Sequence, residues 1–584
     1  MLARPRSVTR LVPLLRAAAL ALSTAALGAA APAAFAQEQE LEETAGSVPS
    51  PITVPAELPP TPVGFTVDAS EAINAANETE TIAETRKRHG TVEAIPEAKV
   101  DGLWEVHYVA DGEPVALIVV DGEGAGILDE WTGPQVIWPM ARGYDRQFGH
   151  VLNAPYVWIP LAAIFFFGLV DLRRPRRIAH LDLLVLLSFG ISHVFFNTAD
   201  IGVSVPLAYP PLLYLLARTI WVGFKGPGEG LRPSAPVTWL AIAIVFLCGF
   251  RIAINIADSG VIDVGYAGVV GADRLTNGEP VYGEGAFPPE VGPGDTYGPA
   301  NYLAYVPFEL ALPWSGVWDD LPAAHGAAIF FDLAAIAGLF FLGRRLRRGR
   351  PGRDLGVMLA FAWAAYPYTA FVTQSNSNDS LVAAPVIWAL VFFTSPAARA
   401  ILLAVAATAK FAPLALVPLF ASGERGLAGR LQKRRLPRPL WLRLAYFSTI
   451  FFATCAFMLV LPTADPGLAT FWDRTLATQI GRESPFSIWG QVSGLQPLQT
   501  LVTVAVAGFA ASLALVPSRR SLARVAALTA AVMIAIELTL DHWFYLYIPW
   551  FLGPLLAAIA MPRRRRRSRT AASPKAPART RPAG

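Results

Sequence analysis

The segment Phe330–Arg350, FFDLAAIAGLFFLGRRLRRGR, decides the fold class of this chain. An almost uninterrupted apolar run is followed directly by five arginines. A helix that crosses a bilayer needs about twenty apolar residues, and Lys and Arg collect on the cytoplasmic side of such helices. The segment therefore predicts a membrane helix whose arginine-rich end faces the cytoplasm.

The composition extends this prediction to the whole chain. Of its 584 residues, 54% are hydrophobic and only 16% are charged, whereas soluble domains average roughly 25% charged residues. The apolar runs and the basic clusters predict a mainly α fold, a polytopic α-helical membrane protein with about eleven spans plus re-entrant segments. The predicted spans are Val151–Val170, His180–Asn197, Val205–Phe224, Val237–Ile256, Phe330–Leu342, Gly356–Thr373, Leu381–Phe393, Leu440–Leu461, Leu498–Val516, Leu522–Leu538 and Tyr547–Met561.

Two further apolar segments do not fit a single crossing. Tyr302–Trp314 lies in a long outer loop, and one crossing there would put the following arginines outside. Ile401–Phe420 has basic residues on both sides and is interrupted by Lys410, Pro413 and Pro418. Proline breaks helices, and irregular backbone at membrane depth is tolerated where protein buries it. We therefore predict an interfacial or re-entrant helix in the first case and two half-helices in the second.

The rest of the chain divides by composition. Basic residues, an apolar run and small residues at its end are typical of a signal peptide, which directs the residues after it out of the cytoplasm. Cleavage is the prediction, with an uncleaved anchor helix as the alternative. The predicted divisions are a signal peptide at 1–36, a flexible lead-in at 37–66, a small extracytoplasmic α+β domain at 67–145, accessory membrane helices at 151–236, the main membrane domain at 237–561, and a basic, disordered cytoplasmic tail at 562–584.

The small domain has clear local signals. Asp68 and Glu71 fit the capping box of a helix that continues to Gly90. Leu103–Val109 and Pro114–Val120 predict a β-hairpin, and Ala125–Trp131 predicts a third strand. We expect the packing of helix on sheet to bury Trp104, Val106, Tyr108, Leu117 and Val119.

The cysteine and histidine content excludes two kinds of site. The chain has only two cysteines, Cys248 and Cys455, so neither a disulfide scaffold nor a thiolate metal cage is expected. Its seven histidines are scattered and no pair has the spacing of helical metal ligands. No metal site is predicted.

Polar residues collect in the stretches expected outside the membrane, and they suit transfer of a sugar from a lipid phosphate. A carboxylate can act as general base on an acceptor hydroxyl, cations can stabilise a departing phosphate, and aromatic rings can stack on sugars. The candidates are Asp263 and Asp258 for catalysis, Lys410, Arg474 and Arg482 for the donor phosphate, and Tyr266, Tyr282, Asn376, Asn378, Trp489 and Trp543 for the sugar or the acceptor.

Each candidate has a structural alternative. Asp263 can cap a helix, and Lys410 can extend towards the interface as Lys does near helix ends. Arg251 can pair with Asp332 or Asp258. For the whole chain, the alternative function is a polytopic transporter or a lipid-linked sugar flippase, because broken helices with a buried Lys also occur in transporters.

Several motifs carry a resemblance to a known family. Ile262–Gly268 (IDVGYAG), Tyr297–Pro299 (YGP), Ala409–Pro413 (AKFAP) and Gly481–Ser487 (GRESPFS) follow one another along the chain. In this order they resemble the GT-C superfamily of integral membrane glycosyltransferases, and among these glycosyltransferase family 87, which is polyprenyl-phosphate-dependent and mannosyltransferase-like. The resemblance covers roughly residues 237–561.

The resemblance implies an inverting transfer from a polyprenyl-phosphate sugar, needing no other cofactor, to an acceptor outside the cytoplasm. Asp263 matches the loop aspartate to which the family assigns the catalytic role. Many members have two adjacent acidic residues there, whereas Asp258 and Asp263 are separated, so the choice between them stays open. Many relatives also have Tyr-Pro-Pro in place of Tyr297–Pro299.

A second resemblance concerns the small domain. Gly102–Val106 (GLWEV), Ile118–Asp121 (IVVD) and Glu130–Gly133 (EWTG) resemble a PepSY-like domain, which implies binding or regulation. The expected partners are membrane lipid, a lipid-linked sugar donor and a cell-envelope glycan or lipid acceptor, with no nucleic acid. The expected location is the cell membrane, with a multi-pass chain, an extracytoplasmic N-terminal domain and a cytoplasmic C-terminal tail.

Overall fold

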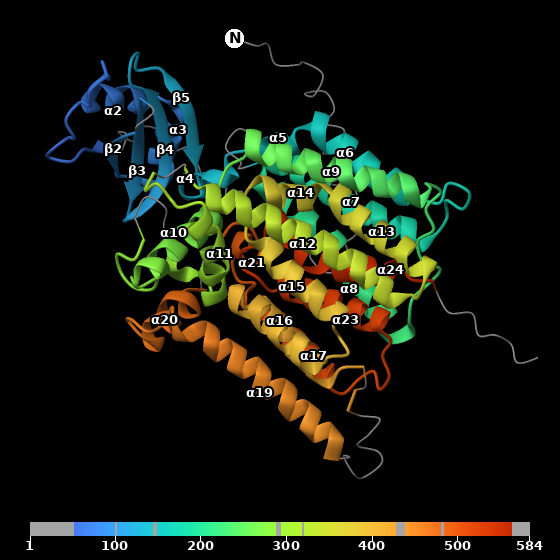
Figure 1. Ribbon diagram of the computed structural model, residues 1–584. Coiled ribbons are helices and arrows are strands. Elements are labelled where there is room, and N and C mark those ends of the chain that lie inside the picture. Colours follow the sequence, from blue (N-terminus) through green and yellow to red (C-terminus); the bar gives the residue numbers. More distant parts are fainter. Residues whose placement is uncertain are drawn as a thin grey trace, which may run out of the picture.

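The computed structural model describes residues 52–99, 102–143, 149–287, 294–317, 320–424, 426–427, 438–479 and 484–562. Figure 1 shows a small sheet domain beside a large bundle of helices. The predicted signal peptide, the first half of the predicted lead-in (residues 37–51), Arg482 and the basic tail after Pro562 lie outside the described residues.

The small domain is a five-stranded sheet with helices, as the α+β prediction requires. The strand order is β1-β2-β3-β4-β5, with β1 parallel to β2 and the other neighbours antiparallel. β1 and β2 were not predicted, and β1 lies within the segment expected to be a flexible lead-in. The elements are β1 (Ile52–Thr53), α2 (Ala69–Asn77), α3 (Glu80–His89), β2 (Val92–Ala98), β3 (Leu103–Ala110), β4 (Glu113–Asp121) and β5 (Ile127–Thr132).

The helix predicted between Asp68 and Gly90 is in fact two helices. The capping box of α2 is present, because Glu71 N donates to Asp68 Oδ1 at 2.8 Å and Asp68 N donates to Glu71 Oε2 at 3.2 Å. The chain then breaks, and the Thr79 hydroxyl caps α3 by accepting from Ile82 N at 3.4 Å. Gly90 ends α3 with a φ of +79°, a conformation that glycine adopts without strain.

The hairpin forms as predicted, but the faces of β4 differ from the prediction. Trp104 pairs with Val120 and Val106 with Ile118, so these residues share the face covered by the helices. Leu117 and Val119 are buried, but the alternation of side chains in a strand puts them on the opposite face. The cause is a register shift between Tyr108 and Val109.

The bundle contains the apolar runs predicted as spans, each as a helix or a pair of helices. They pack so that segments far apart in sequence lie side by side, such as α8 with α23 and α15 with α24. The longer elements are α6 (Pro155–Leu169), α7 (Ile178–Asn197), α8 (Ile201–Lys225), α9 (Val237–Ala257), α10 (Asp263–Asn277), α11 (Pro299–Ala311), α12 (Pro322–Leu346), α13 (Arg350–Ala365), α14 (Pro367–Gln374), α15 (Asp379–Val391), α16 (Pro396–Ala409), α19 (Arg438–Val460), α22 (Gln496–Ser512), α23 (Leu522–Glu537) and α24 (Ile548–Ile559).

Short elements connect these helices. Most of them lie in the segments between predicted spans. They are α4 (Pro134–Ile137), η2 (Pro139–Ala141), α5 (His150–Asn153), η5 (Gly294–Thr296), η6 (Ala412–Leu416), α17 (Val417–Ser422), α20 (Leu468–Thr475), η7 (Ala477–Gln479), α21 (Ile488–Gln491) and η8 (Tyr545–Tyr547), where η denotes a 3₁₀ helix.

The prediction of a membrane protein is supported by helix length and composition. Among the described residues, five helices are long and apolar enough to cross a membrane, namely α7, α8, α9, α12 and most of α19. The pair α13 and α14, bent by 58° at Tyr366, gives a sixth candidate, and several shorter apolar helices accompany them. The number of about eleven spans is not confirmed.

The segment Ile401–Phe420 forms the predicted broken helix. α16 ends at Ala409, and after Lys410 the chain continues through η6 into α17. One guanidinium nitrogen of Arg399 donates to Phe393 O at 2.7 Å and the other lies 3.4 Å from Ala421 O, so the two half-helices return to the same end. Lys410 lies at the tip of this hairpin, which we call the α16–α17 hairpin.

One buried ion pair and its hydrogen bonds join four helices within the bundle. Arg251 of α9 donates through Nε to Asp332 of α12 at 3.0 Å and through Nη2 at 2.5 Å. The remaining guanidinium donors reach Ala364 O, Thr369 and Thr373. Of the two partners predicted for Arg251, the structure shows Asp332.

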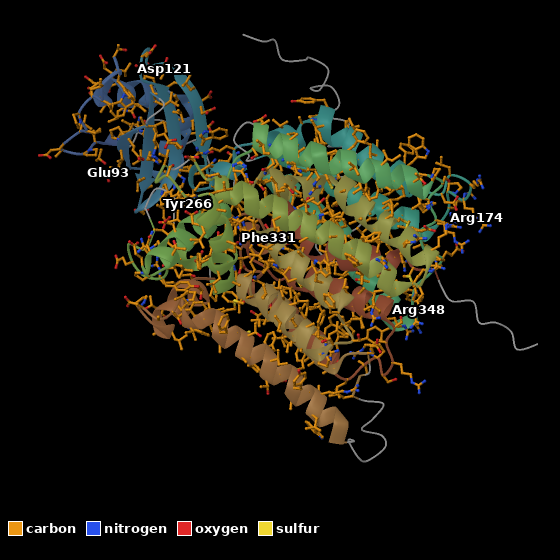
Figure 2. The ribbon with its side chains drawn as sticks, in the orientation of Figure 1. Glu93, Asp121, Arg174, Tyr266, Phe331 and Arg348 are labelled. Atoms are coloured by element: carbon orange, nitrogen blue, oxygen red, sulfur yellow. The ribbon has the colours of Figure 1, made fainter. Side chains whose placement is uncertain are left out.

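Charge separates along the bundle. Figure 2 shows Arg174 and Arg348 near one end, whereas Tyr266 lies at the other end, next to the small domain. The arginine clusters that follow α6 and α12 therefore share an end, as the positive-inside pattern requires. We call this the arginine end and the opposite one the site end.

Candidate functional site

The first part of the candidate site is the start of α10 at the site end. Asp263 is exposed at the first position of α10, and the hydroxyl of Tyr297 donates to its Oδ2 at 2.9 Å. Tyr297 is held in place by the next residue, because a Cβ on Gly298 would lie 2.0 Å from Thr408 O. The close contact between Gly298 and Thr408 therefore brings Tyr297, and with it Asp263, to the tip of the α16–α17 hairpin.

The second part is a buried carboxylate at the start of α15. Asp379 is only 1% exposed, and Lys410 Nζ lies 2.6 Å from its Oδ1. The indole nitrogen of Trp550 donates to the same oxygen at 2.8 Å, and the Ser377 hydroxyl donates to Oδ2. Hydrogen bonds and an opposite charge together make burial of this carboxylate tolerable.

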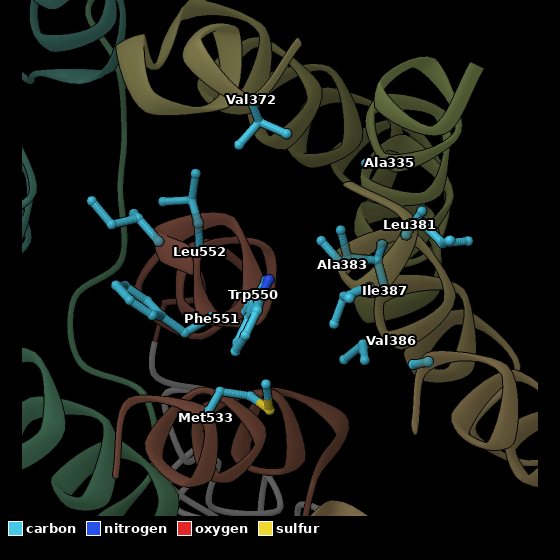
Figure 3. Close-up of a cluster of buried hydrophobic side chains, with 14 of the residues drawn as sticks. Ala335, Val372, Leu381, Ala383, Val386, Ile387, Met533, Trp550, Phe551 and Leu552 are labelled. Carbon is cyan, nitrogen blue, oxygen red and sulfur yellow. The ribbon is translucent and has the colours of Figure 1, made fainter. Parts of the chain in front are cut away.

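Aromatic rings surround the ammonium group of Lys410. Its nitrogen lies 5.0 Å from the centre of the Tyr547 ring and 5.2 Å from that of Trp550, within the range of cation–π attraction. These two rings stack on each other with centres 4.4 Å apart. Figure 3 shows Trp550 on α24 among apolar side chains such as Ile387 and Met533, which fix its ring.

Tyr297 and Tyr547 connect the two parts. Burial raises the pKa of the Tyr297 phenol well above its ordinary value of 10.0, and the nearby Asp263 carboxylate and Tyr547 add to the increase. Tyr297 therefore stays protonated and remains a donor to Asp263. Tyr297 thus bonds Asp263 on one side and interacts electrostatically with Tyr547 on the other, and the Tyr547 ring faces Lys410, which pairs with Asp379.

Beside Asp379, several buried polar atoms have no hydrogen-bond partner among the described residues. Asn378 Nδ2 donates to Asn301 Oδ1 at 2.8 Å, but Asn378 Oδ1 and Asn301 Nδ2 are left over. The hydroxyls of Tyr305 and Ser380 also have no hydrogen-bond partner among the described residues. Buried polar groups are normally paired, so these atoms remain able to form hydrogen bonds with a molecule that binds here.

Asn376 has a different, structural position. It is fully buried with a positive φ of 49°, accepts from Asn255 Nδ2 at 2.8 Å, and donates to Ser259 and to Gly260 O. Asn255 also approaches His325 at 3.1 Å. The network ties the α9–α10 connection to the α14–α15 connection and so supports the position of Asp263.

Arg474 is bound to a carboxylate in this structure. It makes a two-point contact with Asp295, at 2.5 Å from Nε and 3.1 Å from Nη2. Asp295 is buried and also accepts from Gly283 N at 3.1 Å. Tyr282, likewise buried, donates its hydroxyl to Tyr297 O at 3.0 Å. These contacts brace the loop that carries Tyr297, and the hydrogen bond to Asp295 raises the pKa of Arg474 above its ordinary value.

Besides Tyr282, the three other aromatic residues predicted to bind sugar are buried within the protein. Tyr266 packs edge-on against Trp314 with ring centres 6.1 Å apart. Trp489 donates to Leu538 O at 3.0 Å, and Trp543 donates to Glu537 Oε2 at 3.0 Å. Their side chains hold the loops at the site end together, and a role in sugar stacking stays a prediction.

Of the predicted site residues, the structure brings together Asp263, Lys410 and Asn378. Asp258 is exposed after the end of α9, and Arg482 lies outside the described residues. Sequence reasoning did not select Asp379, Tyr297, Trp550 or Tyr547 as site residues. The available signals were the polar run Gln374–Asp379 between two apolar segments and the position of Tyr297 next to Gly298.

A separate acidic group lies on the small domain. Ligand atoms of Glu97, Glu105 and His107 lie within 4.8 Å of one another. Lys99 Nζ is 2.7 Å from Glu97 and 3.4 Å from Glu105, so a cation of the chain itself already pairs with both carboxylates. The hydrogen bond from His107 lowers the pKa of the Glu105 carboxyl despite its partial burial. These contacts explain the group as part of the sheet surface.

The comparisons with known proteins add no relative. No protein-family model matches the sequence, and no curated protein matches it significantly. The class of protein has to be inferred from the residues and from the geometry described above.

Proposed function

We propose that the chain is a membrane glycosyltransferase, of the hexosyltransferase class, that moves a sugar from a polyprenyl-phosphate donor to an acceptor on the outer face of the membrane. The observation that carries this proposal is the position of Asp263. An exposed carboxylate, hydrogen-bonded to Tyr297, lies at the same end of an apolar bundle as a partly exposed ammonium group lined by aromatic rings.

In this proposal Asp263 is the general base. Its carboxylate accepts the proton of the acceptor hydroxyl while the hydroxyl oxygen bonds to the anomeric carbon of the donor sugar. The bond from that carbon to the phosphate oxygen breaks, and the electron pair leaves with the phosphate. Attack from the face opposite the leaving group inverts the anomeric centre. Tyr297 holds the carboxylate in position through its hydroxyl.

Lys410 is the cation proposed to bind the leaving phosphate. An ammonium group has three donors, and Asp379 accepts one of them. The side chain is 13% exposed, so the others have an approach from outside the ion pair. A fixed charge next to the leaving group stabilises the transition state because it needs no reorientation. Arg474 is given a bracing role instead, because Asp295 already binds it.

The proposed orientation places the site end outside and the arginine end in the cytoplasm. The common end of the clusters near Arg174 and Arg348 supports it. About eleven crossings, an outward small domain and an inward tail follow from the same rule. A lipid-linked donor presents its phosphate and sugar at the headgroup plane, where Asp263 would lie in this orientation.

The test compares two aspartates of one connection. Asp263→Asn keeps the size of the side chain but removes the base, so transfer should fall by about 10²–10⁴. Asp258→Asn is the matched control, because Asp258 is also exposed but does not bond Tyr297. The measurement is transfer from labelled polyprenyl-phosphate mannose, and separately from other lipid-linked sugars, with thermal unfolding of each purified variant.

Three outcomes decide the matter. A large loss confined to Asp263→Asn supports the assignment. A loss confined to Asp258→Asn moves the base to Asp258. Activity in both variants contradicts a glycosyltransferase with its base in this connection, and the transporter or flippase alternative then takes precedence.

A further inference from the structure

A cleft lies between the small domain and the outer loops of the bundle. It has a volume of about 650 Å³. It is lined by α3, by the start of β4 and by residues between Thr132 and Trp138, and on the side of the bundle by Ser484, Pro485 and Gly490. α4 lies between the sheet and the bundle, next to this cleft (Figure 1). This volume falls within the range of small-ligand sites, about 300–1,000 Å³. A cleft of this kind also differs in shape from the flat face of a protein-docking surface.

The lining of the cleft combines polar and apolar side chains. Glu84, Arg88 and Thr132 contribute polar groups to the cleft, and Ile137, Trp138 and Pro485 contribute apolar surface. A carboxylate and a guanidinium group in the same cleft offer both an acceptor and donors while their charges offset each other. This combination suits an uncharged ligand with hydroxyls on its edges and C–H groups on its faces, which describes a chain of sugar rings.

The floor of the cleft is connected to the candidate site. The Trp138 ring lies 5.5 Å from the centre of Phe486 and 5.5 Å from that of His542. Ser484, which lines the cleft, contacts His542 Nδ1 at 3.0 Å. His542 begins the short segment that leads to Tyr547, whose ring covers Lys410. A ligand in the cleft would therefore rest on the same loops that form the site.

We propose that this cleft binds the non-reacting sugar units of an oligosaccharide acceptor, so that the small domain selects acceptors by length. The inference rests on the proposed function. It assigns the acceptor to the glycan class and gives the small domain a substrate-binding role.

The experiment uses full-length protein in lipid nanodiscs and linear mannose oligosaccharides, from monosaccharide to hexasaccharide, as probes. Arg88→Ala and Glu84→Gln change two exposed residues that line the cleft. Lys87→Ala and Glu80→Gln are the matched controls, because these neighbours on α3 are exposed but do not line it. Transfer kinetics are measured for each acceptor, and binding without donor is measured by saturation-transfer NMR.

The expected result is a KM that falls as the acceptor lengthens in the wild-type protein and in both controls. Loss of one hydrogen-bonding group should raise the KM for the hexasaccharide about two- to tenfold in each cleft variant. The KM for the monosaccharide and the KM for the donor should not change.

Other outcomes separate the two proposals. Cleft variants that match their controls at every length overturn the inference, as does wild-type protein that binds none of the oligosaccharides. If binding without donor depends on Arg88 and Glu84 but no transfer occurs, the cleft assignment stands and the proposed function fails.

Discussion

Replacing Lys410 should destabilise the protein more than replacing its ion-pair partner Asp379. Lys410→Met leaves the carboxylate of Asp379 at 1% exposure, with donors from Trp550 and Ser377 but no cation. Breaking a buried ion pair in this way costs about 3–5 kcal/mol of stability. The reverse change, Asp379→Asn, keeps an acceptor for Trp550 and leaves an ammonium that retains its two aromatic contacts. We expect it to cost about 1–3 kcal/mol, the value of a lost charged hydrogen bond.

The double variant makes the prediction sharper. Asp379→Asn combined with Lys410→Met removes both charges, so the penalty for an unpaired buried carboxylate disappears. Its stability should exceed that of Lys410→Met alone, with a coupling energy of about 2–4 kcal/mol between the two sites. Equilibrium unfolding in detergent micelles, measured for all four proteins, gives this coupling directly.

Function and stability should separate in the same set of proteins. The double variant regains stability but lacks the ammonium group, so its use of the lipid-phosphate donor should stay as low as in Lys410→Met. Additive free energies would refute the ion pair as a stability determinant. Donor use that recovers together with stability would refute the phosphate role of Lys410 and leave it as a structural residue.

Two further predictions concern the loop around Tyr297. Arg474→Ala leaves Asp295 buried with the Gly283 N–H as its remaining described donor, so limited proteolysis near Gly283 should speed up several-fold; unchanged cleavage would contradict the bracing role. Tyr297→Phe removes the hydroxyl that holds Asp263, and the catalytic rate should fall about two- to tenfold with the donor KM unchanged. Because the pKa of Tyr297 is raised above 10.0, its hydroxyl keeps its proton as the pH rises. The wild type and Tyr297→Phe should therefore lose activity at the same alkaline pH. A loss near pH 10 in the wild type alone would contradict the raised pKa of Tyr297.

Local patterns predicted local structure well. The apolar runs give the helices of the bundle, since burial or lipid contact requires apolar surface whatever the partner is. Lys410, Pro413 and Pro418 predicted the hairpin because a proline cannot continue a helix hydrogen-bond ladder. The capping box at Asp68 likewise involves residues only three positions apart.

The faces of β4 could not be predicted, for a specific reason. A tight turn at Asp111 and Gly112 without irregularity would pair Val106 with Leu117, and this regular pairing is what the alternation of apolar residues predicts. The bulge between Tyr108 and Val109 shifts the pairing by one residue, so that Val106 pairs with Ile118. A shift of one residue exchanges the two faces of a strand. No residue type in this hairpin indicates that the shift occurs.

The candidate site was only partly predictable because its contacts are distant in sequence. Asp379 is 31 positions from Lys410 and 171 from Trp550. Periodicity describes one helix at a time and contains no information on which helices meet. Arg474 shows the same limit in another way. As a cation in an outer segment it was predicted to bind the donor phosphate, but it pairs with Asp295, which lies 179 positions away in the sequence.

Arg251 with Asp332 and Lys410 with Asp379 are two buried ion pairs of the bundle that point to different roles, and the difference lies in what surrounds them. Arg251 uses each of its guanidinium nitrogens on described partners from α12, α13 and α14, so it leaves no capacity for a ligand. Lys410 meets one carboxylate and two rings. Next to it, Asn301, Asn378 and Tyr305 have polar atoms without partners among the described residues. Polar groups left unpaired in an apolar interior cost free energy unless something binds them. These unpaired groups lie at the end of the bundle where Asp263 is exposed, so a polar substrate that bound there would gain hydrogen bonds that the described residues do not supply.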